Sequence, residues 1–463
     1  MFSWLVELSA QSIFRYAAAL FVFSLWVNLV CFNWSEAPII YPDSHGYIMP
    51  AKQLSQHQLP DFSLRSPTYP IYLGVMALFG RTINGSPLKV AVFGQIVLGA
   101  IGTVLFYLLS VKLLKKEWLA FGVSALLALN FEVINYQSTI LTETLSTTLL
   151  MAVLFAHIAS LGQRLTLKRL VVLVTVDSLL VMVRPNFVFL PTCLYAVQFL
   201  NYLPIFKTTS AVLRFAGSST FFLILGIVCN LGLVATWSAF YYLQTGHLRL
   251  TPTSDFNLLG KAIQYGYLDR NYVAPPSLAR RAQEIYYEEG RPSDPYVVIN
   301  RLKKENLYTA GNLRSINSHF LAGHQVDFLI KTGRLLPDVL SKRPGFYYGR
   351  PKDLSQSPWL QSIARGFNLL HVLNGAAVVF ALFYLSLIVK RQSNQFMALV
   401  MILSTVFYHL IAMTAFAYDE YSRLRVPIDL LLNLLVFFPF MLFAAYVGQR
   451  VKIRLRDSIA EAI

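Results

Sequence analysis

Charged residues are scarce in this chain of 463 residues: Asp, Glu, Lys and Arg together make up 13% of it, while hydrophobic residues make up 56%. Soluble globular domains carry about 25% charged residues, so the composition excludes an ordinary water-soluble fold. Apolar runs of about 20 residues recur along the chain, and each is long enough to cross about 30 Å of hydrocarbon. The sequence therefore predicts an all-α, polytopic membrane protein.

Cysteine is also scarce, and familiar chemical motifs are missing. The three cysteines, Cys31, Cys193 and Cys229, each lie in an apolar run without a metal-ligand spacing, and we interpret them as packing residues. The chain has no GxxxxGKS or GxxxxGKT loop for nucleotide phosphates and no HExxH zinc motif. No metal site is clearly encoded, and a requirement for a divalent metal stays open.

Acidic residues are outnumbered by basic ones, 23 against 39, which gives a formal net charge of +16 at pH 7. In a soluble protein this excess would suggest a nucleic-acid partner, whereas in a membrane protein Lys and Arg mark the cytoplasmic side. Here they follow every second predicted span. We therefore expect no nucleic-acid partner, a position in the cytoplasmic (inner) membrane, and both termini in the cytoplasm.

The apolar runs predict about ten transmembrane helices. They lie at 13–32, 88–110, 118–136, 143–161, 169–184, 186–204, 214–240, 366–389, 396–416 and 426–447. The apolar piece at 69–80 is too short to cross the bilayer and is predicted to be a juxtamembrane helix on the outer face. This pattern divides the chain into an N-terminal membrane module (1–240), an outer loop region (241–365) and C-terminal helices with a cytoplasmic tail (366–463).

The loop at 241–365 is too long for a simple connector, and we expect it to form short helices over the membrane mouth. The first outer loop, at 33–67, carries the sequence YPDSHGY at 41–47. Asp43 there is a candidate catalytic base at the lipid–water boundary, or a helix-capping acid, a place that Asp favours. His45 has three interpretations: a partner that positions another site residue, a metal ligand or an interfacial polar residue.

Further candidates follow along the predicted outer side. The sequence RSPTYP at 65–70 places Arg65 and Tyr69 in either a structural loop or a substrate contact. Glu143 begins a predicted helix, where an acid is favoured electrostatically, and it could also line an outer cavity as a second acid. Asp177 lies inside a predicted span, which implies a partner or a cavity that the sequence does not name.

Three arginines also fall on this outer side, away from the basic inner loops. Arg184 stands before Pro185, which ends the preceding helix, and Arg423 and Arg425 open the last span. Arg suits a phosphate because its planar fork bonds two oxygens at once. A structural alternative pairs the last two arginines with Glu420 and Asp429. The buried polar residues His371, Asn374 and His409 are expected to form helix–helix hydrogen bonds.

The order of these motifs resembles that of one family. D-S-x-x-Y follows the first span, then come R-x-P-x-Y-P, T-E at a helix start, R-P-N, and S-R-x-R-x-P before the last helix. This order resembles the multi-pass, lipid-carrier-dependent glycosyltransferases of the C-type fold. The nearest resemblance is to bacterial relatives of the dolichyl-phosphate-mannose protein mannosyltransferases and of the aminoarabinose transferase that acts on lipid A. It covers roughly residues 10–200 and the last helices, and the long outer loop matches poorly.

The resemblance implies an inverting transfer of a hexose or pentose from a polyprenyl-phosphate carrier to a glycan, lipid or protein acceptor outside the membrane. By this resemblance Asp43 is the general base and Glu143 a second cavity acid. The substrate-binding and phosphate-facing positions fall on His45, Tyr47, Arg65, Tyr69, Arg184, Arg423 and Arg425. Some relatives have two adjacent acids in the first loop, whereas Ser44 follows Asp43 here, which leaves a metal-binding role open.

The runner-up interpretation is a transporter or flippase for lipid-linked sugars, which would use the same basic cavity without transfer. A flippase needs access from both faces, and broken helices in paired halves often mark transporters. The sequence shows no such halves, and its polar residues gather on one side.

Overall fold

The structure is a computed structural model that describes residues 10–31, 38–200, 210–269, 277–292, 294–341, 358–388, 394–417 and 421–462. Within these ranges the regular structure is helical, and the β pairing is one isolated bridge between Ile39 and Thr139. Six helices are long and apolar enough to cross a membrane. The all-α, multi-pass architecture predicted from the sequence is therefore confirmed.

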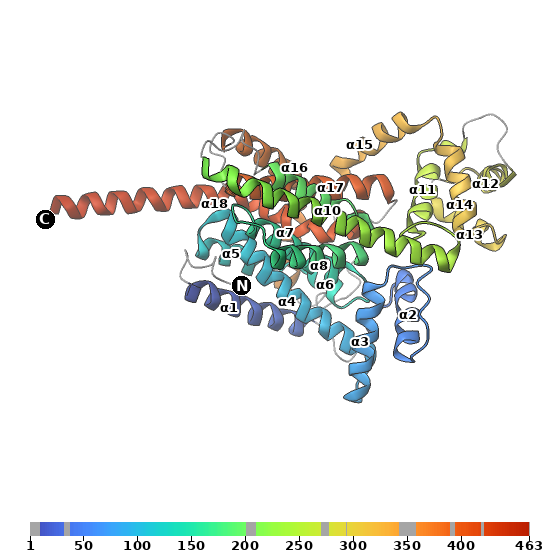
Figure 1. Cartoon of the computed structure of the whole chain (residues 1–463), viewed down its shortest axis with the longest axis horizontal. Helices are drawn as coiled ribbons and strands as arrows, with labels where there is room; N and C mark the ends of the chain where they lie inside the picture. Colours follow the sequence, from blue (N-terminus) through green and yellow to red (C-terminus); the bar gives the residue numbers. More distant parts are fainter. Residues whose placement is uncertain are drawn as a thin grey trace.

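The six spans belong to helices that run alongside one another in the body of the molecule (Figure 1). They are α1 (Ala10–Cys31), α4 (Pro87–Leu114), α10 (Ser210–Thr245), α16 (Pro358–Ile388), α17 (Asn394–Phe416) and α18 (Tyr421–Ala462). A seventh crossing is formed if α5 (Glu117–Leu127) and α6 (Phe131–Gln137) are taken together, although they are bent by 61°. Asn130 caps α6 by accepting a hydrogen bond from the Glu132 amide, which stabilises the break.

The predicted count of ten spans is not confirmed. Helices do form at the other three predicted places, as α7 (Glu143–Ala159), α8 (Leu167–Val183) and α9 (Leu190–Leu200), but they have 17, 17 and 11 residues. A straight crossing needs about 20. The α8 helix ends at Arg184 because Pro185 has no amide hydrogen to continue it.

Two short helices follow the first span. The helix α2 (His45–Ser55) packs on α3 (Thr68–Thr82), which occupies the place of the predicted juxtamembrane helix and is steeply inclined to α4 (Figure 1). One side of α3 is exposed and apolar, with Ile71, Val75 and Phe79 each about half exposed. The buried side, including Tyr69 and Leu73, faces the neighbouring helices.

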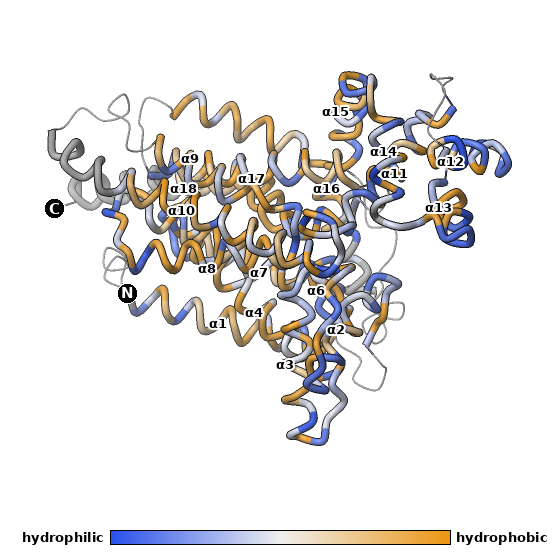
Figure 2. Tube along the Cα trace, turned by 45° about the vertical axis from the view of Figure 1, so that its right-hand side comes forward, coloured by the Kyte–Doolittle hydropathy of each residue, from blue (hydrophilic) through white to orange (hydrophobic). Residues whose placement is uncertain are grey.

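The long loop folds into a helical unit with a hydrophobic core of its own. This unit, called the loop unit below, contains α11 (Thr253–Gln264), α12 (Ser277–Glu288), α13 (Pro295–Lys304) and α14 (Ala310–Leu321). It lies beyond one end of the spans (Figure 1), where hydrophilic residues are concentrated (Figure 2). The helix α15 (Gln325–Ser341) leads back to α16 and α17. The predicted short helices are therefore present, and their position over the membrane mouth stays a prediction.

Candidate functional site

The turn that carries Asp43 is held from behind by Ser44. The Ser44 hydroxyl donates to the carbonyl of Ile140 and accepts from the Tyr41 amide, both at 2.8 Å. The amide of Ile140 in turn donates to the carbonyl of Ile39. A short 3-10 turn at Pro42–Ser44 then leads into α2. These bonds fix the Asp43 turn against the segment just before Glu143.

The Asp43 carboxylate lies between two arginines. Its Oδ1 accepts from Arg65 Nη2 at 2.7 Å, and its Oδ2 accepts from Arg423 Nη2 at 2.8 Å. The Asp43 side chain keeps 36% of its surface exposed, whereas that of Arg423 keeps 8%. Asp43 is therefore the accessible acid of the group, and the arginine behind it is shielded.

Glu143 forms the buried side of the same group. Its Oε1 accepts from Arg184 Nη2 and from Arg423 Nε, each at 2.9 Å, and its side chain is 0% exposed. Arg423 thus contacts both acids. The acid–arginine cluster, as we call it, consists of Asp43, Arg65, Glu143, Arg184 and Arg423, five residues from five separate segments of the chain.

Two bonding positions in the cluster are open. Among the described residues, Arg184 Nη1 and Glu143 Oε2 are buried and have no hydrogen-bond partner. The three arginines outnumber the two carboxylates, so the cluster has one positive charge in excess when both acids are ionised. A free guanidinium donor beside excess positive charge suits an anionic ligand with oxygen acceptors.

The electrostatics of Asp43 follow from its neighbours. Burial of part of the carboxyl acts to raise its pKa, but the charges of Arg65 and Arg423 and the hydrogen bonds from them outweigh burial. The pKa of Asp43 is therefore lowered below its usual value of 3.8. The carboxylate therefore stays ionised at neutral pH. Its two arginines also make it a weaker base than a free carboxylate.

Tyrosines support the cluster. The Arg65 guanidinium lies 4.9 Å from the ring centre of Tyr47, and that of Arg423 lies 4.7 Å from the ring centre of Tyr41. Tyr69 packs edge-on against Tyr47 and donates from its hydroxyl to Gln95 Oε1 at 2.6 Å. Tyr47 and Tyr69 are buried, so they back the arginines rather than line an open surface.

Two predicted site residues lie outside the cluster. His45 is exposed at the start of α2. Arg425 is fully buried and binds elsewhere: Nε donates to Asp429 Oδ1 at 2.6 Å, and Nη1 donates to the carbonyl of Val339 at 2.6 Å. The sequence offered Glu420 and Asp429 as structural partners for the two arginines. Asp429 pairs with Arg425, and Glu420 lies outside the described residues.

Sequence reasoning missed a second buried charge network. Arg425 Nη2 is 3.1 Å from His371 Nδ1, and His371 Nε2 is 2.9 Å from Glu132 Oε2. His371 was expected to bond across helices, but Glu132 gave no signal because its partner lies more than 200 positions away. Asp177 finds its partner in His157, at 3.2 Å within the same helical body. Both sets are buried contacts in which an acidic side chain has a polar partner, as acids inside a membrane protein require.

Lys261 is a third residue that the sequence did not single out. It is fully buried on α11, and its ammonium donates to the hydroxyl of Tyr421 at 2.5 Å, at the start of α18. It also lies over the rings of Tyr265 and Tyr421. Burial lowers the pKa of Lys261 to about 7. This contact joins the loop unit to the helix that carries Arg423.

Within the part of the chain that the structure describes, no three residues among His, Cys, Asp and Glu converge as a metal site. No protein-family model and no curated protein matches the sequence.

Solved structures with a similar arrangement of helices do exist. The archaeal oligosaccharyltransferase AglB from Archaeoglobus fulgidus, in complex with an inhibitory peptide and a dolichol-phosphate, aligns with a TM-score of 0.43 and 12% identity over 94% of this chain and 52% of that chain. The apo form of the Archaeoglobus fulgidus oligosaccharyltransferase gives a TM-score of 0.44 and 12% identity over 95% and 52%. This chain thus spans about half the length of those proteins.

A second similar protein is ArnT from Cupriavidus metallidurans bound to undecaprenyl phosphate, with a TM-score of 0.34 and 11% identity over 92% of this chain and 78% of that chain.

Proposed function

We propose that the protein is a membrane glycosyltransferase that moves a hexose or pentose from a polyprenyl-phosphate carrier to an acceptor on the outer side of the cytoplasmic membrane. The observation that carries the proposal is the acid–arginine cluster. An accessible carboxylate, Asp43, contacts the buried Arg423, which shares Glu143 with a second buried arginine, Arg184, and Arg184 has a free donor. A base for one substrate and a cationic site for a phosphate are the two groups that such a transfer needs.

The arginines serve the donor. As the bond between the sugar's anomeric carbon and the phosphate oxygen breaks, its electron pair goes to the phosphate, which is a stable leaving group. Arg184 Nη1 is free to donate to a phosphate oxygen. The Arg423 guanidinium, which contacts both acids of the cluster, can contribute a second donor. Fixed positive donors aimed at developing negative charge lower the barrier in a site shielded from water.

Asp43 serves the acceptor. The acceptor hydroxyl forms the new bond to the anomeric carbon while its proton passes to the Asp43 carboxylate, and a single displacement of this kind inverts the anomeric centre. The acceptor hydroxyl must approach from the exposed side of Asp43, because the other sides face Arg65 and Arg423. Phosphate binding favours the reaction further. An arginine that turns toward the phosphate no longer lowers the pKa of the Asp43 carboxylate, which then becomes a stronger base.

Glu143 has a supporting part in this proposal. It is fully buried and accepts from both Arg184 and Arg423, so it sets the spacing and orientation of their guanidinium groups. The partners of the reaction are a polyprenyl-phosphate-linked sugar, membrane lipids, and a glycan, lipid or protein acceptor. The cluster lies at the end of the spans near the loop unit, and we expect this end to lie outside the cytoplasm because positively charged residues favour the opposite end.

One observation favours the second candidate, a transporter for lipid-linked sugars. The bend of 61° between α5 and α6 is a broken helix inside the bundle, a device that transporters use around their substrate sites. A transporter would move the intact lipid-linked sugar between leaflets and would leave the sugar on its carrier. The two candidates therefore differ in whether a sugar–phosphate bond is broken.

The deciding experiment follows lipid-linked sugars and surface glycans by mass spectrometry in cells with and without the gene. A transferase predicts the loss of one glycan substituent and accumulation of its polyprenyl-phosphate sugar. Purified protein in lipid vesicles should then release free polyprenyl phosphate when donor and acceptor are supplied on the same side. Movement of intact donor across the vesicle membrane without release of polyprenyl phosphate would overturn the transferase proposal in favour of the transporter.

A further inference from the structure

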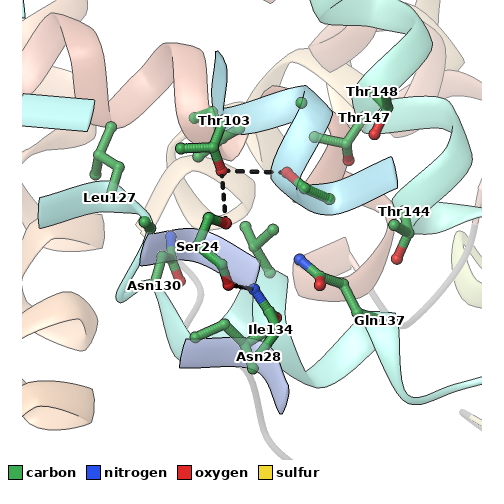
Figure 3. Close-up of a pocket in the computed structure, with 15 residues that line it drawn as sticks. Ser24, Asn28, Thr103, Leu127, Asn130, Ile134, Gln137, Thr144, Thr147 and Thr148 are labelled. Atoms are coloured by element: carbon green, nitrogen blue, oxygen red, sulfur yellow. Dashed lines mark hydrogen bonds between the residues drawn. The ribbon is translucent and has the colours of Figure 1, made fainter. Parts of the chain in front are cut away.

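A small polar cavity lies within the helical bundle, apart from the acid–arginine cluster. Its volume is about 20 Å³, and α1, α4, the break between α5 and α6, α7 and α18 all contribute to its wall (Figure 3). The polar residues that line it are Ser24, Asn28, Thr103, Asn130, Gln137, Thr144, Thr147 and Thr148. None of its lining residues is charged. A polar cavity that holds a water molecule needs about 10–15 Å³, so this one has room for one or two.

Two glycines of α4 let the neighbouring helices pack closely beside the cavity. A methyl group at Gly99 would lie 2.3 Å from Gln137 Nε2, and one at Gly102 would lie 3.1 Å from Thr148 Oγ1. Without those methyl groups α4 approaches α7 and the end of α6 closely. The wall opposite is the α5–α6 break, where Ala128 and Asn130 line the cavity.

Four buried polar atoms of the lining have no partner among the described residues: Asn28 Oδ1, Asn130 Nδ2, Gln137 Oε1 and Thr144 Oγ1. Their side chains are between 1% and 3% exposed. Two of the amide orientations are fixed by a second bond. Asn28 Nδ2 donates to the Ser24 carbonyl, and Asn130 Oδ1 accepts from the Glu132 amide. Asn28 therefore presents an acceptor, and Asn130 presents a donor.

From this set of groups we infer that the cavity is a binding site for buried water. The open groups are two acceptors (Asn28 Oδ1 and Gln137 Oε1), one donor (Asn130 Nδ2), and one hydroxyl that can act as either (Thr144). Water, with two donors and two lone pairs, matches this set. A dry cavity would leave all four groups unsatisfied in the membrane interior, which is costly.

The alternative occupant for a cage of neutral oxygens is a monovalent cation. The amide hydrogens of Asn130 oppose it, because the other end of that amide is committed to the Glu132 backbone and cannot turn an oxygen inward. No carboxylate lines the cavity to balance a charge. Water is thus the ligand that all four groups accept.

The site has a structural consequence. Backbone that leaves the helix inside a membrane is stable only where protein or water satisfies it. The bound water supports the α5–α6 break, and that break directs Glu132 toward His371 and the Arg425 network. The inference does not depend on the proposed transfer reaction, since none of the cluster residues lines the cavity.

The first test is X-ray radiolytic footprinting of the full-length protein in lipid. Radicals formed from a bound water oxidise the side chains beside it even when bulk solvent cannot reach them. Leu127, Ile134 and Leu430 line the cavity and are buried, so we expect them to be labelled at least several-fold faster than Ile402 and Leu431, which are buried elsewhere in the bundle. Labelling at equal, background rates in both sets would overturn the inference.

The second test uses the direction in which one substitution changes the Tm. Thr144→Val keeps the shape of the side chain but removes a hydroxyl that has no protein partner. If water is bound, the variant loses a hydrogen bond and its Tm falls by about 1 °C. If the cavity is dry, the variant loses an unsatisfied polar group and its Tm rises. Thr148→Val is the matched control, because the Thr148 hydroxyl already donates to the Leu98 carbonyl and its loss lowers Tm in either case.

The same samples separate water from a cation. Melting curves are recorded in Na⁺, K⁺ and choline salts at constant ionic strength. A water site predicts equal Tm values in the three salts. Stabilisation by Na⁺ alone that disappears in Thr144→Val would assign the cavity to a cation and overturn the inference.

Discussion

The guanidinium of Arg423 lies 2.8 Å from the carboxylate of Asp43, although 380 positions separate the two residues in the sequence. This contact brings the first loop and the last span into one site. Asp43 carries the accessible carboxylate, and Arg423 connects it to the buried acid Glu143. The chemistry proposed for the protein depends on this relationship, and the first two predictions test its two partners.

Asp43→Asn is expected to reduce sugar transfer by about 10²–10⁴-fold, since the amide keeps the size of the side chain but cannot accept the proton. Donor binding and Tm should change little. A helix-capping role predicts full activity instead, because Asn caps as well as Asp. Asp61→Asn is the matched control: Asp61 lies in the same loop and only accepts from the Ser63 amide. Transfer by purified protein in lipid is the measurement, and near-normal rates for Asp43→Asn would leave this carboxylate a structural residue.

Arg184→Lys should weaken donor binding by more than tenfold, although the charge is retained. Lys carries its three donors on one nitrogen, so it cannot keep its bond to Glu143 and also place a donor at the separate position of Arg184 Nη1. Arg81→Lys is the control, because Arg81 bonds Ser55 at the α2–α3 hairpin and lies outside the cluster. The measurement is binding of polyprenyl phosphate. Equal affinity for Arg184→Lys and the parent protein would remove Arg184 from the donor site.

Arg425→Met is expected to destabilise the protein by about 3–5 kcal/mol, because the change leaves Asp429 as a buried acid without its cation. The double variant Arg425→Met with Asp429→Leu should regain most of the loss and retain donor affinity, since this pair lies apart from the acid–arginine cluster. Thermal melting and donor binding are measured on both variants. If the stable double variant binds polyprenyl phosphate much less tightly than the parent, Arg425 contacts the carrier as the sequence motif implied.

Lys261 predicts a pH dependence of stability with a definite sign. Its pKa falls from the usual 10.5 to about 7 on folding, because the ammonium is buried. Between these values the unfolded chain binds a proton that the folded chain does not, so stability should rise as pH increases from about 7 toward 10.5. Lys261→Met removes this contribution. The variant should therefore have the higher Tm below pH 7, and the difference in Tm from the parent should shrink as pH rises. A difference that does not change with pH would contradict the shifted pKa.

The sidedness of the membrane is tested by cysteine labelling in a background without the three native cysteines. An impermeant reagent added outside intact cells should label a cysteine at His45 or Tyr287, which are exposed on α2 and α12, and should spare one at Lys116. Labelling at Lys116 alone would reverse the orientation and place the cluster in the cytoplasm.

Much of the cluster could be predicted from sequence because its members sit where helices begin or end. Glu143 opens α7, Arg184 closes α8 before a proline, and Arg423 lies at the start of α18. A membrane boundary gathers such positions at one level, so acids and arginines found there can meet when they lie on the same side of the membrane. Their pairing, however, needs the arrangement of five segments, which no local pattern contains.

Arg425 shows the opposite case. Residues two positions apart on a helix point in different directions, so Arg423 and Arg425 cannot both face one ligand-sized site without a break between them. The helix is unbroken there, and the two arginines serve separate networks. The Arg425 network joins helices far apart in sequence, which explains why His371 was recognised only as a polar contact and Glu132 was overlooked. The count of ten spans stays unconfirmed for a related reason: apolar runs at α7 and α8 continue into the next element, and composition alone does not show where each helix stops.

The position of Arg423 also sets the order in which the site is completed during synthesis. Asp43, Glu143 and Arg184 all lie within the first 184 residues, whereas the ribosome adds their partner Arg423 much later. Until the last span inserts, the two acids lack the cation that joins them. The cell therefore obtains a working cluster only from a nearly finished chain, and fragments released early from the ribosome carry both acids without the group that unites them.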